Sequence, residues 1–203
     1  MQKRKLINPS EGGHWGIMGG TFNPVHNGHL IMAESVMHSV EADGMLFIPA
    51  RKHPLKPANE IESSYDDRKA MVVMAIDSNP QFRLEDGPEH SGYTIDLIDY
   101  LKHKYPHATF FLPIGSDIID EFHKWYKYDE IEALISIVIA ARPGHSDSRR
   151  TDGVLKSAEY VIIPQYDVAS STIRERVKNR MSIKYLVPES VELFIYSRGL
   201  YGE

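Results

Sequence analysis

Two histidines that follow a glycine turn are the residues best placed to do chemistry together. His26 and His29 are three residues apart in the stretch 15–30, WGIMGGTFNPVHNGHL, just after Gly19 and Gly20. This spacing places the second imidazole in the first turn of a helix, close to the first imidazole. Glycines let a backbone approach a ligand closely, and a helix N-terminus offers unpaired N–H donors. The stretch therefore favours a phosphate site in which imidazoles donate to charge that develops in a transition state.

Other interpretations of the same residues stay open at this point. The glycines alone fit any tight turn between a strand and a helix. The two histidines could be surface residues or half of a metal site. No third ligand lies near them in the sequence, but ligands can arrive through the fold, so a zinc site remains an alternative.

A second helix start far downstream offers complementary groups. Ser171, Thr172 and Arg174 lie in the segment ASSTIRE, between the last predicted strand and a helix. Thr172 and Glu175 match a capping box, which by itself only begins a helix. Hydroxyls, free N–H groups and a guanidinium at one helix start also suit several phosphate oxygens. Two such helix starts in one small domain predict a polyphosphate lying between them.

Alternating strands and helices must position these residues. Apolar runs predict strands over 14–18, 44–50, 82–85, 108–114, 136–141 and 159–163, and helical periodicity predicts helices over 27–40, 64–78, 94–104, 129–135, 172–180 and 188–197. We therefore expect an α/β fold: a single-domain, Rossmann-like, doubly wound parallel sheet with helices on both faces. Ligands of such sheets bind beyond the carboxyl ends of the strands. The turns at 19–20, 115–117 and 142–144 should converge there on one crevice.

Size and composition exclude several classes of protein. The chain has 203 residues, enough for one medium-sized domain, which we expect over 14–203 behind a polar N-terminal arm over 1–13. A net charge of −5 gives no field that would attract nucleic acid or an anionic membrane. The lack of cysteine excludes a disulfide scaffold. Without an apolar signal segment or a membrane-length run, we expect a cytoplasmic protein. The oligomeric state stays open, a homo-oligomer included.

The motifs GGTFNPVHNGHL and SSTIRERV, in this order, resemble the nucleotidyltransferases with a paired-histidine motif, and most closely the bacterial nicotinate mononucleotide adenylyltransferases. The resemblance extends from about residue 15 to Tyr201. Further landmarks are Lys56, Arg68 with Met71, Tyr93-Thr94, Gly115-x-Asp117, Trp125, Arg142-Pro143-Gly144 and Val187-Pro188. The chain departs from the family at Asn23, where Asp is more usual, at Gly92, where Ser is common, and at His53 and Leu55, which interrupt a Pro-Pro-His-Lys stretch.

This resemblance implies an activity, its ligands and a set of site residues. ATP and nicotinate mononucleotide would react to give nicotinate adenine dinucleotide and pyrophosphate, with Mg²⁺ carried on the ATP. The catalytic residues would be His26, His29 and Arg174, with His29 stabilising the five-coordinate α-phosphorus. ATP would be bound by Gly19, Gly20, Thr21, Phe22, Gly115, Asp117, Ser171 and Thr172, and the mononucleotide by Lys56, Tyr93, Thr94 and Trp125.

Several of these implied roles have a structural alternative. Asp117 would accept hydrogen bonds from the ribose hydroxyls, or only cap a helix. Lys56 would meet the mononucleotide phosphate, or be an exposed loop lysine. Trp125 would stack on the pyridine ring, or be an ordinary core aromatic. The N–H groups of Tyr93 and Thr94 would bind the nicotinate carboxylate and so favour the acid over the amide, or simply begin a helix.

Three rival functions share parts of this pattern. One is a sister transferase that acts on phosphopantetheine or transfers a cytidylyl group, and the Tyr93-Thr94 and Trp125 positions argue against it. Another is a nucleotide-binding regulatory module without turnover, against which the intact His26, His29 and Arg174 speak. A class I aminoacyl-tRNA synthetase also has a His-Gly-His signature, but this chain is too short for one.

Overall fold

Six parallel strands form one sheet in the part of the chain that the structure describes. This computed structural model describes residues 6–51, 61–87, 92–141, 155–164 and 167–202. The strands are β1 (Gly13–Gly20), β2 (Gly44–Pro49), β3 (Phe82–Leu84), β4 (Ala108–Gly115), β5 (Ser136–Ala141) and β6 (Glu159–Ile162), in the spatial order β3-β2-β1-β4-β5-β6. The predicted fold class, a doubly wound parallel α/β sheet, is confirmed.

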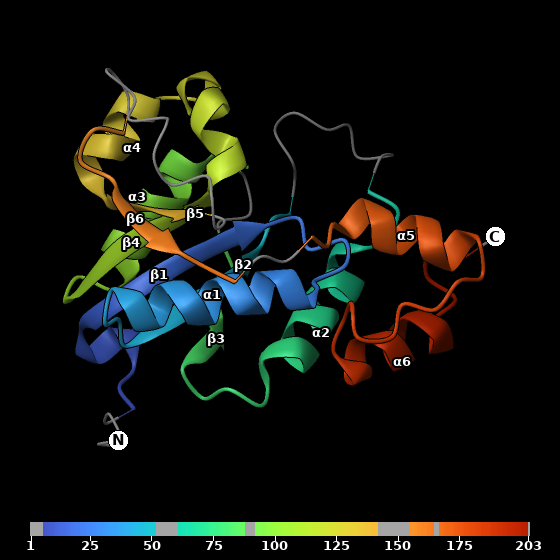
Figure 1. The fold of residues 1–203 in the computed structure, drawn as a ribbon. Helices are drawn as coiled ribbons and strands as arrows, with labels where there is room; N and C mark the ends of the chain where they lie inside the picture. The colour runs from blue at the N-terminus through green and yellow to red at the C-terminus, as the bar shows by residue number, and fades with distance from the viewer. Residues whose placement is uncertain (1–5, 52–60, 88–91, 142–154, 165–166, 203) are drawn as a thin grey trace.

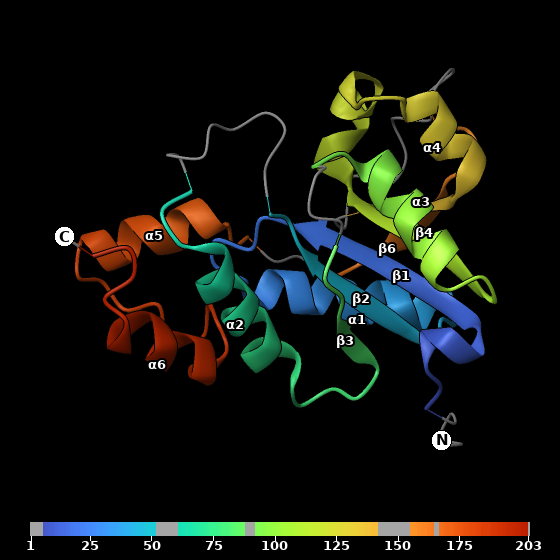
Figure 2. The same cartoon turned by 180° about the vertical axis from the view of Figure 1, so that it is seen from behind.

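Helices cover both faces of this sheet, as Figure 1 and Figure 2 show. They are α1 (Asn27–Ser39) and α2 (Tyr65–Ile76) on one face, and α3 (Thr94–Lys104), the 3-10 helix η3 (Ser116–Lys124) and α4 (Tyr128–Leu134) on the other. The last two helices, α5 (Ser170–Lys178) and α6 (Glu189–Ser197), lie together to one side of the sheet, beside α2. Successive strand residues point to opposite faces. In β2, Met45 and Phe47 therefore join the core that includes side chains of α1, α2, α5 and α6, while Leu46 and Ile48 join the core that includes side chains of α3, η3 and α4.

The sheet opens where a ligand is expected. The pairing of β1 with β4 ends at Gly16 and Phe111, although β1 continues to Gly20 beside β2 and β4 continues to Gly115 beside β5. The strand order also reverses between β1 and β4, because the chain proceeds from β1 to β2 on one side and from β3 to β4 on the other. Such a switch point is where open α/β sheets bind ligands.

Most predicted element boundaries lie within two residues of the observed ones. The helix over 94–104 and the strand over 136–141 match the prediction, while β1 is longer than the predicted 14–18 at both ends. The helix predicted over 172–180 begins earlier, at Ser170, which changes the position of Thr172. No helix within the described ranges is long and apolar enough to cross a membrane.

Residues 6–12 of the predicted N-terminal arm pack against the sheet. They include a short 3-10 helix, η1 (Pro9–Glu11), in which Pro9 is buried. The indole N–H of Trp15 donates to the Gly12 carbonyl (3.0 Å), and the Arg83 guanidinium donates to the Ile7 carbonyl (3.2 Å). Gly13, which the prediction assigned to the arm, is already the first residue of β1. The division into an arm and a domain stays a prediction.

Candidate active site

The two histidines stack at the entrance to α1. His26 is the N-cap of the helix and His29 lies in its first turn, and their ring centroids are 3.7 Å apart at an interplanar angle of 30°. The backbone N–H of His26 donates to Nδ1 of His29 (3.2 Å). A ring nitrogen that accepts cannot carry the proton, so the proton of a neutral His29 is on Nε2. His29 is thereby fixed as a donor through Nε2–H.

Burial keeps both imidazoles neutral at pH 7. His26 is 6% exposed, and its burial lowers the pKa from 6.5 to about 4. Burial also lowers the pKa of His29 well below its usual value, and the neighbouring His26 adds to this effect. Nδ1 of His26 is buried without a hydrogen-bond partner among the described residues. The pair can therefore supply N–H donors to a phosphate without carrying a permanent charge.

Helix α5 is attached directly to the segment that ends at His26, the N-cap of α1. We call residues 19–26 the histidine turn. Arg174 donates through Nη1 to the Asn23 carbonyl (2.8 Å), and the Ser170 hydroxyl donates to the Pro24 carbonyl (2.8 Å). Arg174 also donates through Nε to the carboxylate of Glu62 (2.9 Å). The guanidinium has five N–H donors, so two bonds leave it able to bind phosphate oxygens.

The first turn of α5 differs from the prediction. The helix begins at Ser170 with Ala169 as N-cap, so Thr172 is the third helical residue and the predicted capping box with Glu175 is wrong. The Ser170 side chain bonds to the histidine turn, and no side chain caps the helix. Ser171 and Thr172 are exposed there, as a ligand-binding helix start requires.

The side chain of Asn23 is held from two other elements. Its Oδ1 accepts hydrogen bonds from the hydroxyls of Ser63 (2.5 Å) and Tyr201 (2.8 Å), and all three residues are buried. The hydroxyl oxygens of Tyr201 and Ser63 lie 3.1 Å apart. Burial raises the pKa of the Tyr201 phenol to about 12, so it remains a donor at neutral pH. The chain's last residues thus help to fix the histidine turn.

Gly19 leaves open space at the end of β1. A Cβ built on Gly19 would lie 3.7 Å from Leu97 of α3, an ordinary contact, and Gly19 is exposed. By contrast, a Cβ on Gly20 would press at 3.3 Å on the ring of Phe22. Phe22 has a φ of 49° and its ring meets His29 edge-on with centroids 5.0 Å apart. Gly19 therefore keeps the surface above the strand free for a ligand, whereas the ring of Phe22 packs against His29.

Asp117 lies directly over the end of β4. A Cβ on Gly115 would be 2.3 Å from Oδ1 of Asp117, so a side chain at this position would displace the carboxylate. Asp117 is exposed in the first turn of η3. Its carboxylate thus faces solvent at the carboxyl edge of the sheet, on the far side of the β1–β4 opening from the histidine turn.

The aromatic residues predicted to bind the mononucleotide lie on the opposite face from α1. Tyr93 is the N-cap of α3 and Thr94 is the first residue of that helix. The ring of Tyr93 lies 4.7 Å from that of Tyr126, which is the residue after Trp125. Trp125 is half-buried against Phe122 with ring centroids 5.3 Å apart. Its packing against Phe122 fits a core aromatic, and its solvent-exposed part fits a ring that stacks on the pyridine of the mononucleotide.

Other predicted features have different outcomes. Lys56 and the turn at 142–144 lie outside the described residues. Within the described ranges, no group of three or more His, Asp or Glu side chains could hold a metal ion, so a zinc site at the histidine pair finds no third ligand there.

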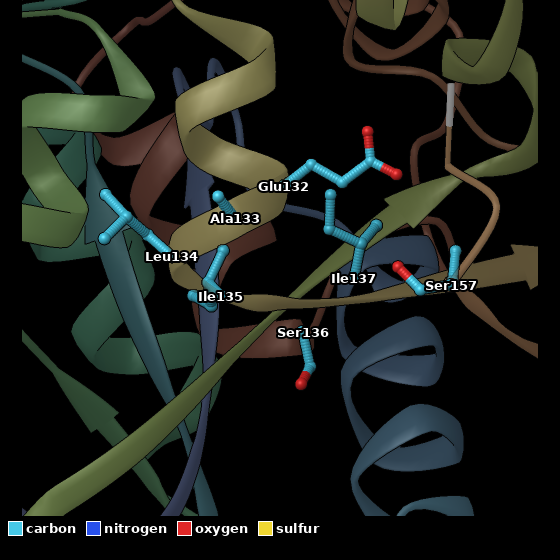
Figure 3. Close-up of a pocket in the computed structure, with 8 residues that line it drawn as sticks. Glu132, Ala133, Leu134, Ile135, Ser136, Ile137 and Ser157 are labelled. Atoms are coloured by element: carbon cyan, nitrogen blue, oxygen red, sulfur yellow. The ribbon is translucent and has the colours of Figure 1, made fainter. Parts of the chain in front are cut away.

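A hollow of about 280 Å³ beside Ser136 and Ser157 lies at the amino end of β5, on the edge away from the histidines (Figure 3).

The structure adds residues that the sequence did not assign to the site. Arg68 was noted only as a landmark, and it is 1% exposed and donates through Nη1 to the Thr21 carbonyl (2.6 Å). Glu62, Ser63 and Tyr201 all contact the histidine turn or its arginine. A polar residue within an apolar helix face is the signal that could have singled out Arg68, since arginine is rarely buried alone.

Comparison with known proteins identifies the family. A model of the cytidylyltransferase-like family matches residues 17–176. The nicotinate-nucleotide adenylyltransferase of Bacillus subtilis is 38% identical over 192 residues, which cover 92% of this chain and 97% of the relative. The chain belongs to the nicotinate-nucleotide adenylyltransferases of this family. A probable nicotinate-nucleotide adenylyltransferase from Oceanobacillus iheyensis is also 38% identical, over 92% of this chain and 96% of its own length.

Solved nicotinate-nucleotide adenylyltransferases share the fold. The Plasmodium falciparum nicotinic acid mononucleotide adenylyltransferase, solved with NaAD, superposes with a TM-score of 0.75 at 20% identity, over 93% of this chain and 97% of that one. A putative nicotinate-nucleotide adenylyltransferase from Vibrio parahaemolyticus gives a TM-score of 0.68 at 23% identity, over 93% and 94% of the two chains. At these identities the likeness concerns the arrangement of the elements.

Proposed function

We propose that this site transfers the adenylyl group in one step, by in-line attack of the nicotinate mononucleotide 5′-phosphate on the α-phosphorus of ATP. As a nicotinate-nucleotide adenylyltransferase, the chain joins these substrates into nicotinate adenine dinucleotide, a step of NAD biosynthesis. An oxygen of the mononucleotide phosphate forms the new bond to the α-phosphorus. The bond from that phosphorus to the bridging oxygen breaks, and pyrophosphate leaves with the electron pair.

One observation carries this proposal: hydrogen bonds connect Arg174 and the histidine pair through the short segment from Asn23 to His26. Arg174 holds the Asn23 carbonyl, and His26 follows three residues later and orients His29. In our proposal the Nε2–H of His29 donates to an α-phosphate oxygen, and Arg174 with the first turn of α5 holds the β- and γ-phosphates. The attacking phosphate is already an anion, so no general base is required. Catalysis then consists of alignment and of donors aimed at developing charge.

The remaining roles follow from position at the same sheet edge. Gly19 keeps room above β1, where Thr21 and Phe22 present backbone to the triphosphate. Asp117, above Gly115 at the end of β4, accepts from the adenosine ribose hydroxyls. The lack of a side chain at Gly20 and Gly115 leaves room for the ring of Phe22 and the carboxylate of Asp117. The exposed Ser171 and Thr172 add hydroxyl and N–H donors for the outer phosphates.

The nicotinate is bound on the other side of the opening. The N–H groups at the start of α3, at Tyr93 and Thr94, face the carboxylate, and Trp125 stacks on the pyridine ring. The ring contact between Tyr93 and Tyr126 supports this arrangement, because it ties the start of α3 to the segment that carries Trp125. Lys56 meets the mononucleotide phosphate. An amide in place of the carboxylate lacks the charge that a helix start favours.

We propose that Mg²⁺ arrives with ATP. Mg²⁺ keeps several waters and commonly binds through substrate phosphates, so few protein carboxylates are needed. The described residues offer donors for phosphate oxygens, and that donor set fits a metal held by the triphosphate. When bound, the ion neutralises charge on the leaving pyrophosphate.

Pyrophosphate release tests the proposal. The protein is incubated with ATP, Mg²⁺ and one acceptor at a time: nicotinate mononucleotide, nicotinamide mononucleotide or phosphopantetheine, with CTP replacing ATP in a further series. We expect rapid release with ATP and nicotinate mononucleotide, and slower release with the amide. Equal rates for acid and amide would remove the proposed role of the α3 start. Tight ATP binding without release from any acceptor would instead identify a regulatory module.

A further inference from the structure

Arg68 is a buried cation that the proposed mechanism does not use. It lies in α2, is 1% exposed, and donates through Nη1 to the Thr21 carbonyl (2.6 Å). Its Nε is buried without a hydrogen-bond partner among the described residues. Neither Asp nor Glu forms an ion pair with it in the described ranges. The phenols of Tyr65 and Tyr201 lie near its guanidinium, which is 5.5 Å from the centroid of the Tyr65 ring. Burial raises the pKa of each phenol to about 12, so both are neutral at pH 7 and neither compensates the charge.

A buried guanidinium without a carboxylate needs an explanation, because burying an unpaired charge is costly. Arg68 lies directly behind the histidine turn, where the proposed ligand carries several negative charges. The interior screens such a charge less than water does, so its field reaches the ligand side of the turn. The substrate would then be the anion that compensates the charge of Arg68.

We propose that Arg68 is a positioning residue for the polyphosphate, and that its buried charge raises affinity in proportion to the negative charge of the ligand. This inference rests on the proposed function, because it takes the polyphosphate to lie at the histidine turn. Arg68 touches the turn through the Thr21 carbonyl and acts on the ligand through it.

The contact with Thr21 also sets the direction of a backbone donor. The C=O of Thr21 and the N–H of Phe22 belong to one peptide unit, and in a trans peptide these two groups point in opposite directions. Holding the oxygen toward Arg68 therefore turns the Phe22 N–H away from it, toward the ligand side of the turn. The same bond keeps a carbonyl oxygen from facing the phosphates.

The test compares ligands that differ only in charge. Dissociation constants for adenosine, AMP, ADP and ATP are measured by calorimetry for the full-length wild type, Arg68→Met and Arg68→Lys. We expect Arg68→Met to bind ATP about tenfold or more weakly but adenosine within about twofold of the wild type, with AMP and ADP between. Arg68→Lys keeps the charge and should restore most of the ATP affinity, but its turnover stays low because the Thr21 carbonyl is no longer held in the same geometry.

Lys69→Met is the matched control. Lys69 is the next residue of the same helix, and the substitution removes the same charge. Its ammonium is paired with Asp86 at 2.6 Å and is partly exposed, so its charge is already compensated. We expect no dependence on ligand charge in this variant. If Arg68→Met does not fold, Arg68→Gln serves as the uncharged variant.

Failure of the inference about Arg68 and failure of the proposed function give different results. An equal loss of affinity for adenosine and ATP in Arg68→Met, or a loss in Arg68→Lys as large as in the uncharged variant, would overturn the role of the charge and leave a purely structural residue. In either case a wild type that releases pyrophosphate from ATP and nicotinate mononucleotide still supports the proposed function. A wild type that binds the nucleotides but releases none would refute the proposed function while the charge series still tests Arg68.

Discussion

At the level of single residues, the two histidines differ in which ring nitrogen remains free. Nδ1 of His29 accepts the His26 N–H, which leaves its Nε2–H to donate. Nδ1 of His26 is buried without a described partner. His29 is therefore a donor of fixed direction, whereas His26 can adapt when a ligand arrives. This difference makes His29 the stronger candidate for contact with the α-phosphate.

Replacement of His29 by Ala should lower kcat by about 10²-fold or more, because a donor aimed at transition-state charge is lost. His38→Ala is the control, since His38 is an exposed histidine in the last turn of the same helix. Both variants are compared by steady-state pyrophosphate release. Unchanged turnover in His29→Ala would remove this residue from the catalytic account.

Gly19→Ala should abolish ATP binding while the thermal unfolding midpoint stays near that of the wild type. The added methyl group makes only an ordinary 3.7 Å contact with Leu97 but enters the space that we assign to the nucleotide. Gly16→Ala is the opposite case, because a Cβ there would be 2.2 Å from the sulfur of Met45. It should destabilise the fold. Normal ATP affinity in Gly19→Ala would show that the nucleotide binds elsewhere.

Burial of His26 should make stability depend on pH. Its pKa is about 4 in the folded protein and 6.5 when unperturbed, so between these values the unfolded chain binds a proton that the folded chain does not. The contribution of neutral His26 is therefore complete above pH 6.5 and falls by on the order of 3 kcal/mol as the pH drops to 4. Urea unfolding from pH 7.5 to 4 should show a flatter profile for His26→Gln than for wild type or His38→Gln. Parallel profiles would contradict this assignment.

At the level of elements, the site depends on how α5 and the segment before α6 hold the entrance to α1. The backbone N–H of Asn27 donates to the Leu186 carbonyl (2.9 Å), and its side-chain amide donates to the Tyr185 carbonyl (2.8 Å). One donor of the α1 start is thus already used by the protein. The phosphate site therefore relies on the imidazoles and on the start of α5 more than on α1 itself.

Replacement of Arg174 by Lys should raise KM for ATP about tenfold or more, although the charge is kept. A lysine cannot hold the Asn23 carbonyl, Glu62 and a phosphate together as the guanidinium can. Arg176→Lys is the matched control, since Arg176 lies in the same helix and donates to the Ser182 carbonyl (2.7 Å). Equal KM values in the two variants would mean that Arg174 does not hold the phosphates.

At the level of the whole molecule, the parallel sheet creates the site by separating two strands. Beyond Gly16 and Phe111, β1 pairs with β2 and β4 pairs with β5, and the groups of the proposed site lie on either side of this opening. The chain's net charge of −5 does not attract a nucleotide. Local donors and the buried Arg68 must therefore supply the attraction that the molecule as a whole lacks.

Much of this architecture could be predicted because strand and helix periodicities are local. The ends of β1 were missed since Gly13, Gly19 and Gly20 join the sheet through backbone pairing and add no apolar signal. The position of Thr172 was missed because Ser170 bonds to the histidine turn, which no local pattern reveals.

Contacts between distant segments account for the rest. Tyr201 bonds to Asn23 across 178 positions, and Arg68 bonds to Thr21 across 47. A hydrogen bond from a side chain to a remote carbonyl or amide leaves no periodic trace in the sequence. The residues that support the histidine turn could therefore be assigned only from the structure, whereas the histidines themselves were recognisable from their spacing.

The most direct test of in-line transfer is the configuration of the α-phosphorus. The reaction is run with nicotinate mononucleotide and one diastereomer of ATP that carries sulfur on the α-phosphate, and the configuration of the dinucleotide product is determined. A single displacement inverts the phosphorus, so we predict inversion. Retention would require two displacements through a covalent adenylyl-enzyme, and it would contradict the proposed mechanism.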